Sequence, residues 1–287
     1  MIAPVDINHL KGWIGRSTEA EETLSRSLVE RFCKTLDADP ARLGETPAGL
    51  HWCLAPPAVS RAEIGPDGHP AKGGFLPPVP LAYRMWAAGD LRFQAPLPMG
   101  EPIRRRSEII EVNLKQGSAG ALVFVEVGHV YHAADRLLLE ERQTIVYKAE
   151  RAVGDATIIT PGACLCERRV ETDPVLLFRY SALTFNGHRI HYDYPYARDV
   201  ELYPDLVVHG PMLATFLMHL AEEGGRKMAG EKRALSRFRF RGVSPAFCNH
   251  PIRLIAAEND TGLALQALGE DDRLVMKAEA EFSGDSE

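Results

Sequence analysis

The sequence has no excess of positive charge and no long apolar run. Its 287 residues carry 33 Lys and Arg against 39 Asp and Glu, a formal net charge of −6, so no overall basic field favours nucleic acid or an anionic bilayer. No apolar stretch reaches the ~18 residues that span a membrane, and the first residues lack a basic segment followed by an apolar run. We therefore expect a cytoplasmic protein that binds neither nucleic acid nor membrane.

The cysteines and the missing short motifs exclude further classes. The five cysteines are odd in number and scattered, and the Cys164-Leu-Cys166 pair lacks the second ligand pair of a zinc site. The patterns G-x-G-x-x-G, G-x-S-x-G and H-E-x-x-H are absent, which argues against a nicotinamide cofactor, a serine hydrolase and a zinc hydrolase. The sequence predicts no cofactor and no metal.

Length and composition favour two globular units. A hydrophobic fraction of 45% with 25% charged residues is enough for a sizeable core, and 287 residues suit two domains of ordinary size. Prolines and glycines gather in residues 150–174, as is typical of a linker. We expect an N-terminal unit at residues 1–150, a linker at 151–174 and a C-terminal unit at 175–287.

Periodicity predicts similar plans for the two halves. Ser17 or Thr18, the acids that follow and an apolar face predict a helix from Ser17 to Asp37, and the glycines and prolines of residues 37–80 predict a long, partly ordered loop. Alternation over residues 81–149 predicts an antiparallel sheet. Residues 209–223 predict a helix buried nearly all round, which Gly224-Gly225 ends, before strands at 235–243, 251–258, 263–268 and 273–282. A sheet around a helix is the plan of a hotdog fold, and two such units predict an α+β double hotdog.

Residues 180–197, read as YSALTFNGHRIHYDYPYA, concentrate amide, imidazole and hydroxyl groups. They resemble the signature of the MaoC-like, R-specific enoyl-CoA hydratases, roughly [ST]-G-D-x-N-P-[IVL]-H-x5-[AS]. Thr184, Ile190, His191 and Ala197 take matching positions, and His209-Gly210 resembles the family's His-Gly at the start of its central helix. Three positions depart from the signature: Phe185 replaces the glycine, Asn186 the catalytic aspartate, and His188-Arg189 the Asn-Pro pair.

These departures resemble a narrower branch, the type 2 3-hydroxyacyl-thioester dehydratases and the mesaconyl-C4-CoA or itaconyl-CoA hydratases. Residues 81–89 and 141–147 also resemble that branch, so the resemblance covers nearly the whole chain. It implies that only the C-terminal unit keeps the catalytic residues. It also implies that the N-terminal unit is a degenerate hotdog contributing to the acyl and CoA pocket.

Hydration of an enoyl thioester requires a base for water and hydrogen-bond donors for the enolate oxygen. We expect His191 to be the base, and the resemblance implies that Asn186 works with it by holding the water. The N–H of Gly210, at a helix start, is suited to the thioester oxygen. Asp193 is a rival base, since on a strand it would share a face with His191. His188 is expected to be a packed histidine, and His209 to support the helix start.

The resemblance implies a hydro-lyase that converts mesaconyl-C4-CoA or itaconyl-CoA to citramalyl-CoA. A distal carboxylate on the acyl group requires a cation, and Arg84 and Arg189 are the candidates. Two alternatives are a dehydratase of straight-chain 3-hydroxyacyl-CoA or acyl-carrier-protein thioesters, and a non-catalytic acyl-CoA binding or scaffold protein. A homodimer is also open. Further expected substrate contacts are Thr184, Tyr192, Asp193 and His209, and the cluster Arg104, Arg105 and Arg106 is either a solvated strand face or a contact to the phosphates of CoA.

Overall fold

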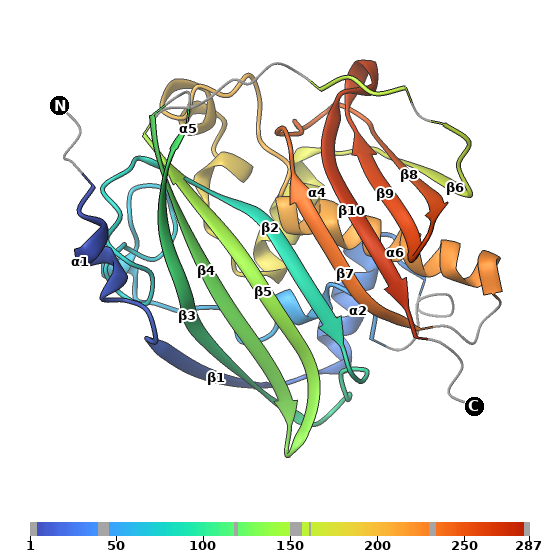
Figure 1. Ribbon diagram of the computed structural model, residues 1–287, viewed down its shortest axis with the longest axis horizontal. Coiled ribbons are helices and arrows are strands. Elements are labelled where there is room, and N and C mark those ends of the chain that lie inside the picture. The colour runs from blue at the N-terminus through green and yellow to red at the C-terminus, as the bar shows by residue number, and fades with distance from the viewer. Residues whose placement is uncertain are drawn as a thin grey trace.

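The computed structural model describes residues 5–39, 46–117, 120–149, 157–160, 162–229 and 234–283. One ten-stranded antiparallel sheet crosses the molecule in the order β1-β3-β4-β5-β2-β7-β10-β9-β8-β6 (Figure 1). The strands of the first half are β1 (Ser17–Thr23), β2 (Tyr83–Phe93), β3 (Pro102–Gly117), β4 (Gly120–Ala133) and β5 (Arg136–Lys148). Those of the second half are β6 (Cys166–Val170), β7 (Leu235–Gly242), β8 (Ile252–Asn259), β9 (Gly262–Leu268) and β10 (Leu274–Phe282).

The strand order repeats about the central β2–β7 pair. Read outward, it is β2-β5-β4-β3-β1 on one side and β7-β10-β9-β8-β6 on the other, so every strand of the first half has a counterpart in the second. The outer strands are followed by helices α2 (Arg26–Thr35) and α4 (Pro174–Leu183), which contact each other. The predicted α+β double hotdog is confirmed, and the two sheets are joined edge to edge into one.

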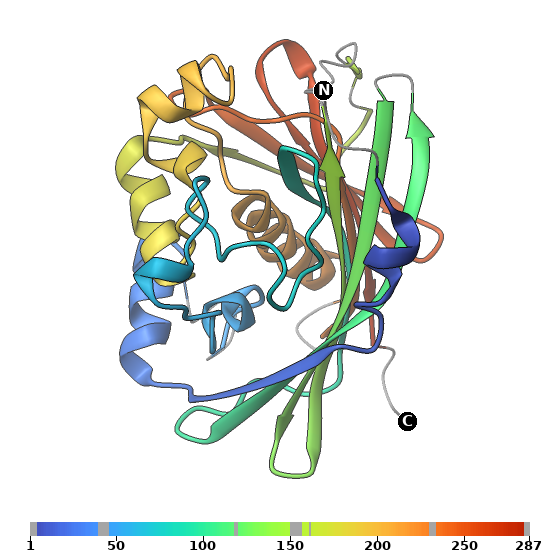
Figure 2. The ribbon, with the colours of Figure 1, turned by 90° about the vertical axis from the view of Figure 1, so that its left-hand side faces the viewer.

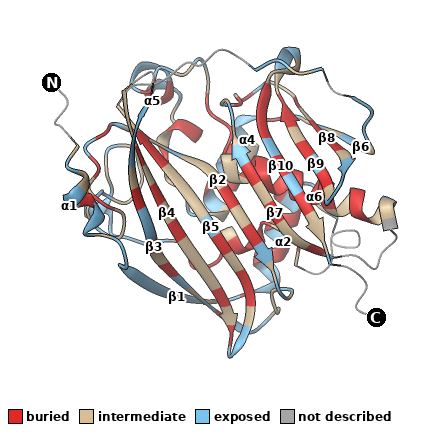
Figure 3. Ribbon diagram, in the orientation of Figure 1, coloured by how far each residue is buried: buried red, intermediate tan, exposed pale blue. Residues whose placement is uncertain are grey.

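Helix α6 (Gly210–Ala229) lies in the concave face of the C-terminal half and contacts β6 to β10 (Figure 2). Its residues from Met212 to Ala221 are buried, as predicted, and Figure 3 shows these buried residues against strands that alternate between buried and exposed positions. The predicted stop at Gly224-Gly225 is wrong, because the helix continues to Ala229. A Cβ atom would lie 2.7 Å from Leu263 at Gly224 and 2.4 Å from Phe282 at Gly225. The glycines therefore allow close packing on the sheet.

The N-terminal half has no such central helix among its described residues. Between α2 and β2 the regular elements of residues 36–39 and 46–82 are the 3-10 turns η1 (Leu50–Cys53) and η2 (Arg61–Glu63). The predicted long loop is thus confirmed, and in Figure 2 this segment, in blue to cyan, lies on the same side of the sheet as α6. The loop of the N-terminal half therefore lies on the face of the sheet that also carries α6 of the C-terminal half.

The helix predicted from Ser17 begins later than expected. Residues 17–23 form edge strand β1, and Ser25 caps α2 by accepting a hydrogen bond from the N–H of Leu28 at 3.2 Å. In β1, Glu19 is paired with Arg106 and Glu21 with Arg104 across the ladder to β3. Opposite charges at paired positions stabilise a strand, which explains why acids that favour a helix start lie in a strand here.

The region predicted as a linker contains β6, an edge strand on β8, while residues 150–156 and 161 lie outside the described residues. The main hydrophobic core includes residues of both halves, among them Phe32, Leu91, Leu213 and Leu254. The division at 151–174 stays a prediction. Short helices α1 (Ile7–Lys11), α5 (Tyr194–Asp199), η3 (Arg189–His191) and η4 (Glu270–Asp272) complete the fold. Among the described residues, no helix combines the length and apolarity needed to cross a bilayer.

Candidate active site

Residues 180–197 form the end of α4, a tight turn, η3 and α5. Thr184 ends α4, and its hydroxyl donates to the carbonyl of Tyr180 at 2.8 Å. Phe185 follows with a positive φ of 50°, which reverses the chain. The strand geometry considered for His191 and Asp193 is wrong. Asp193 instead caps α5, accepting from the N–H of Tyr196 at 3.2 Å, and so does not share a strand face with His191.

His191 is buried and held in one orientation. Its Nδ1 lies 2.7 Å from the carbonyl oxygen of Val207. Since a carbonyl only accepts, Nδ1 carries the proton and Nε2 is left as an acceptor. Burial lowers the pKa of His191 to about 4, opposed by this hydrogen bond. The imidazole is therefore neutral at pH 7 and can take a proton from water.

Two more imidazoles contact His191. The ring of His209 stacks on it with centroids 3.7 Å apart, and the ring of His188 meets it edge-on at 5.4 Å. His209 Nε2 is bonded to the hydroxyl of Ser181 at 2.8 Å. Burial holds the pKa of His209 well below its usual range and lowers that of His188 to about 2. Both are neutral, so neither ring repels a proton-accepting His191.

Asn186 lies in the turn that leads into these histidines. Its Oδ1 accepts from the N–H of His188 at 3.0 Å, and its own N–H donates to the carbonyl of Ser181 at 2.9 Å. Among the described residues, no partner is found for the Nδ2 amide of Asn186. This group is free to donate a hydrogen bond to a water or a substrate oxygen.

Gly210 begins α6 beside β2. The carbonyl of His209 accepts from Leu213, and within the described chain no acceptor is found for the N–H of Gly210 or Met212. A Cβ atom on Gly210 would lie 3.8 Å from the carbonyl oxygen of Trp86, which is ordinary contact. Neither crowding nor a positive φ requires glycine here. A ligand that closely approaches the free N–H groups would require it.

A loop of the N-terminal half, residues 64–70, docks onto this turn. The N–H of Arg189 donates to the carbonyl of Asp67 at 2.9 Å, and Nη1 of Arg189 donates to that of Pro66 at 3.1 Å. Gly68 and Gly187 meet backbone to backbone, since a Cβ atom on Gly68 would lie 1.9 Å from the Gly187 carbonyl oxygen. The loop brings His69 to 4.4 Å from the ring of His188.

The two arginines predicted for a distal carboxylate lie in different surroundings. The Arg84 side chain is only 8% exposed, and its Nε is 3.2 Å from Asp67 Oδ2. Its positive charge also contributes to the lowered pKa of His188. Arg189 instead points outward, paired with Asp193 at 2.8 Å and stacked on Tyr196. Arg84 is therefore the cation beside the histidine cluster.

Tyr192 and the basic cluster of residues 104–106 make their contacts outside the histidine cluster. Tyr192 is 47% exposed and donates to the carbonyl of Gly187 at 3.0 Å. Strand alternation turns Arg105 away from Arg104 and Arg106: Arg105 donates to the carbonyl of Ala55 at 2.6 Å, while Arg106 pairs with Glu108. A phosphate site on this strand would use Arg104 and Arg106 at most.

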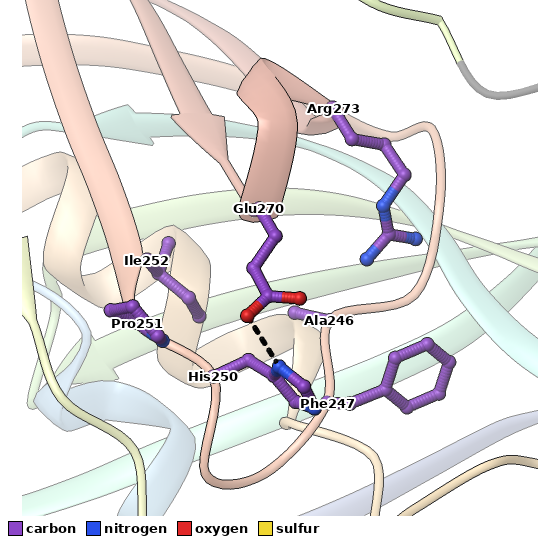
Figure 4. Close-up of a pocket in the computed structure, with 8 residues that line it drawn as sticks. Ala246, Phe247, His250, Pro251, Ile252, Glu270 and Arg273 are labelled. Carbon is purple, nitrogen blue, oxygen red and sulfur yellow. Dashed lines mark ion pairs between the residues drawn. The ribbon is translucent and has the colours of Figure 1, made fainter.

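A separate hollow lies at the end of the C-terminal sheet (Figure 4). It is lined by residues 246–247, 250–252, 269–270 and 273, with His250 Nδ1 2.9 Å from Glu270 Oε1. Neither His191 nor Asn186 lines it. Two of its lining residues, Ala246 and Phe247, pair with residues 208 and 207 respectively, and the carbonyl of residue 207 is the one that binds His191.

Sequence reasoning missed Asp67 and His69. With His188 they form a group whose ligand atoms all lie within 4.8 Å of one another, and these are the residue types of a metal site. Arg84 already pairs with the carboxylate, so the charge that would attract a cation is neutralised. The only local signal was Gly68, because the docking partner lies more than 100 residues away.

Comparisons with known proteins show the family and the fold of the chain. The family model described as hydroxyacyl-thioester dehydratase type 2 matches residues 49–248. A mesaconyl-C(4)-CoA hydratase of Chloroflexus aurantiacus is 38% identical over 278 residues, 95% of this chain and 97% of that protein. A crystal structure of a MaoC-like dehydratase from Phytophthora capsici superposes with a TM-score of 0.70 at 14% identity, covering 98% and 99% of the two chains. A Mycobacterium tuberculosis protein described as a double hotdog covers 94% and 96% with a TM-score of 0.54 at 14% identity.

Proposed function

The chain belongs to the hydroxyacyl-thioester dehydratase type 2 family of MaoC-like hotdog proteins and is a hydro-lyase, and we propose that it hydrates a branched C5-dicarboxylyl-CoA. The substrate is mesaconyl-C4-CoA or itaconyl-CoA, and the product is citramalyl-CoA. The relative from Chloroflexus aurantiacus, named a mesaconyl-C(4)-CoA hydratase, supports this substrate. Membership of a hydro-lyase family argues against the non-catalytic alternative.

The observation that carries the mechanism is the hydrogen bond from His191 Nδ1 to the Val207 carbonyl at 2.7 Å, since it leaves Nε2 as an acceptor. In the proposed reaction Nε2 takes a proton from water as the water oxygen bonds to the β-carbon. The electrons of the double bond then move toward the thioester oxygen. The protonated His191 returns its proton to the α-carbon, which completes the addition of water.

Gly210 and Asn186 have supporting roles in this proposal. The enolate oxygen accepts from the N–H of Gly210, where the positive end of the α6 dipole adds to the stabilisation. The free Nδ2 of Asn186 holds the water, a role in which an amide can replace the aspartate of the wider family. His209 keeps the His191 ring in place by stacking at 3.7 Å.

Arg84 supports the dicarboxylate assignment. A buried guanidinium beside the histidine cluster can pair with a distal carboxylate through two nitrogens, and its ion pair with Asp67 keeps the side chain in the site in the absence of substrate. Arg189 does not lie beside the histidine cluster in this way, because it is paired with Asp193 and stacked on Tyr196. Binding of CoA phosphates by Arg104 and Arg106, a cytoplasmic location and a homodimer stay predictions of the sequence.

The second candidate is a dehydratase of straight-chain 3-hydroxyacyl-CoA or acyl-carrier-protein thioesters. It is favoured by the description of the matching family and uses the same catalytic groups. Purified protein given mesaconyl-C4-CoA should show loss of the conjugated enoyl-thioester absorbance. Turnover of crotonyl-CoA without turnover of mesaconyl-C4-CoA would favour the second candidate instead.

A further inference from the structure

Tyr147 has a buried hydroxyl beside Arg84. The two residues are direct partners across the β2–β5 ladder, so their side chains lie on one face of the sheet. Tyr147 is fully buried, and within the described residues no hydrogen bond of good geometry satisfies its hydroxyl. Burial raises the pKa of Tyr147, and Arg84 opposes that rise both by its charge and by a side-chain hydrogen bond, so the guanidinium lies within reach of the hydroxyl. A buried hydroxyl is unfavourable unless something binds it.

The Arg84 guanidinium also has donors to spare. Its Nε contacts Asp67 at 3.2 Å without hydrogen-bond geometry, and its Nη2 donates a long hydrogen bond of 3.5 Å to the Pro70 carbonyl. Asp67 Oδ1 meanwhile accepts from the N–H of His69 at 3.1 Å. The carboxylate therefore holds the arginine and the His69 backbone together, while the remaining guanidinium donors stay available.

His69 closes the same corner from the loop of residues 64–70. Its ring lies 4.4 Å from that of His188, which in turn lies 5.4 Å from that of His191. In the described part of the chain neither ring nitrogen of His69 has a hydrogen-bond partner. Polar groups without partners thus extend from the proposed base into the N-terminal half.

Arg84 and Gly210 both lie close to Trp86. Arg84 and Trp86 are two residues apart on β2, so their Cα atoms are separated by about 6.8 Å. Trp86 in turn lies against Gly210, where a Cβ atom would be 3.8 Å from the Trp86 carbonyl oxygen. A thioester oxygen at Gly210 would leave the rest of a short acyl chain to run along the face of β2 on which Arg84 lies.

We propose that Arg84, Tyr147 and His69 form a carboxylate-binding corner that selects dicarboxylyl-CoA substrates over straight-chain ones. This inference rests on the proposed function and assigns specificity to the N-terminal unit. Tyr147 and His69 bind the distal carboxylate together with Arg84, and Asp67 is a positioning residue for the arginine. Two of the three binding side chains come from the neighbouring strands β2 and β5, and the third comes from the docked loop.

A divalent cation is the other ligand class that these residue types can attract, through Asp67, His69 and His188. The charges favour an anion. Arg84 already neutralises Asp67, and burial keeps His188 uncharged near neutral pH. A cation would therefore meet the buried guanidinium, whereas a carboxylate would be attracted by it.

The Tyr147→Phe variant provides the sharpest test, because it removes only a hydroxyl, whose polar neighbour in the unliganded protein is Arg84. We expect its KM for mesaconyl-C4-CoA to rise about tenfold, the effect of one lost hydrogen bond to a charged group, with kcat/KM for crotonyl-CoA unchanged. Its melting temperature should be unchanged or higher. Tyr131→Phe, a fully buried tyrosine on β4, is the matched control and should leave the ratio of the two substrates unchanged.

His69→Ala should show the same selective rise in KM. If the wild-type protein hydrates mesaconyl-C4-CoA, but the two variants affect both substrates equally or affect neither, the carboxylate-binding corner is overturned and the proposed function is not. Absence of wild-type turnover of mesaconyl-C4-CoA would overturn both this inference and the proposed substrate. Calorimetric titration with Zn²⁺ gives a further test, since tight 1:1 binding that His69→Ala abolishes would replace the carboxylate corner by a metal site.

Discussion

Replacing Gly210 by alanine separates a requirement of the substrate from a requirement of the fold. A Cβ atom there would lie 3.8 Å from the Trp86 carbonyl oxygen and 4.0 Å from Cε3 of the same residue, so the protein has room for it. Gly to Ala at a compatible position usually stabilises a protein by about 0.4–1 kcal/mol. We expect the melting temperature of Gly210→Ala to be unchanged or slightly higher.

The same methyl group should block the approach of a thioester oxygen to the N–H of residue 210. Loss of one such donor typically lowers kcat by about 10²–10³, equivalent to about 2.7–4 kcal/mol of transition-state stabilisation. The assay is the rate of enoyl-thioester absorbance loss with mesaconyl-C4-CoA, with binding followed by calorimetry. Wild-type turnover by Gly210→Ala would refute the assignment of this N–H, and an unfolded variant would refute the packing argument.

Two other glycines provide controls for this experiment. At Gly242, near the same end of the sheet, a Cβ atom would lie 3.6 Å from the carbonyl oxygen of Ala87, so Gly242→Ala should be folded and active. At Gly89 it would lie 2.3 Å from the ring of Phe240. Gly89→Ala should therefore lose about 1–3 kcal/mol of stability through overpacking. The three variants together show whether Gly210 differs from glycines that serve packing.

Three further predictions concern the buried histidines and the docked loop. Since the pKa of His191 is lowered to about 4, kcat/KM should hold at pH 6 and fall only as pH drops through about 4, whereas an unperturbed imidazole would give an acid limb near pH 6.5. The free energy of unfolding, measured by urea unfolding, should fall as pH drops below 6.5, because histidines take up protons in the unfolded chain and stay neutral where they are buried in the fold. One histidine with a folded pKa of about 4, such as His219, lowers that free energy by about 2 kcal/mol at pH 5. Gly68→Ala should displace the loop of residues 64–70 and lower both kcat/KM and melting temperature, since Gly68 has a positive φ of 89° and its Cβ atom would meet Gly187. Gly100→Ala has a similar φ of 82° with open space and should affect only stability; equal loss of activity in both variants would contradict the docking argument.

Much of the fold could be predicted because its signals are local. Alternation marked the strands β3 to β5 and β7 to β10, and the apolar stretch after His209 marked α6. Two boundaries could not be predicted locally. The acids of residues 17–23 favour a helix start, but in the fold they face Arg104 and Arg106 across β1 and β3. Gly224-Gly225 has the composition of a helix stop, but the sheet packs against both glycines.

The candidate site divides in the same way. His191, Asn186 and Gly210 lie within 25 residues of one another, so a motif could group them. His69 and Tyr147 reach the site only through the docked loop and the β2–β5 pairing, and such contacts have no local signal. Arg84 was predicted as one of two arginines. Only the ion pair with Asp67 and the outward position of Arg189 distinguish them.

The central claim is that the imidazole of His191 takes the proton of the water added to an enoyl-CoA. Steady-state turnover of mesaconyl-C4-CoA by His191→Ala, with calorimetric binding of a CoA thioester to the same preparation, tests it most directly. A general base contributes about 10²–10⁴ in rate, so kcat should fall by that factor while the dissociation constant stays close to that of the wild type. A variant that binds the thioester and turns it over at the wild-type rate would contradict the claim.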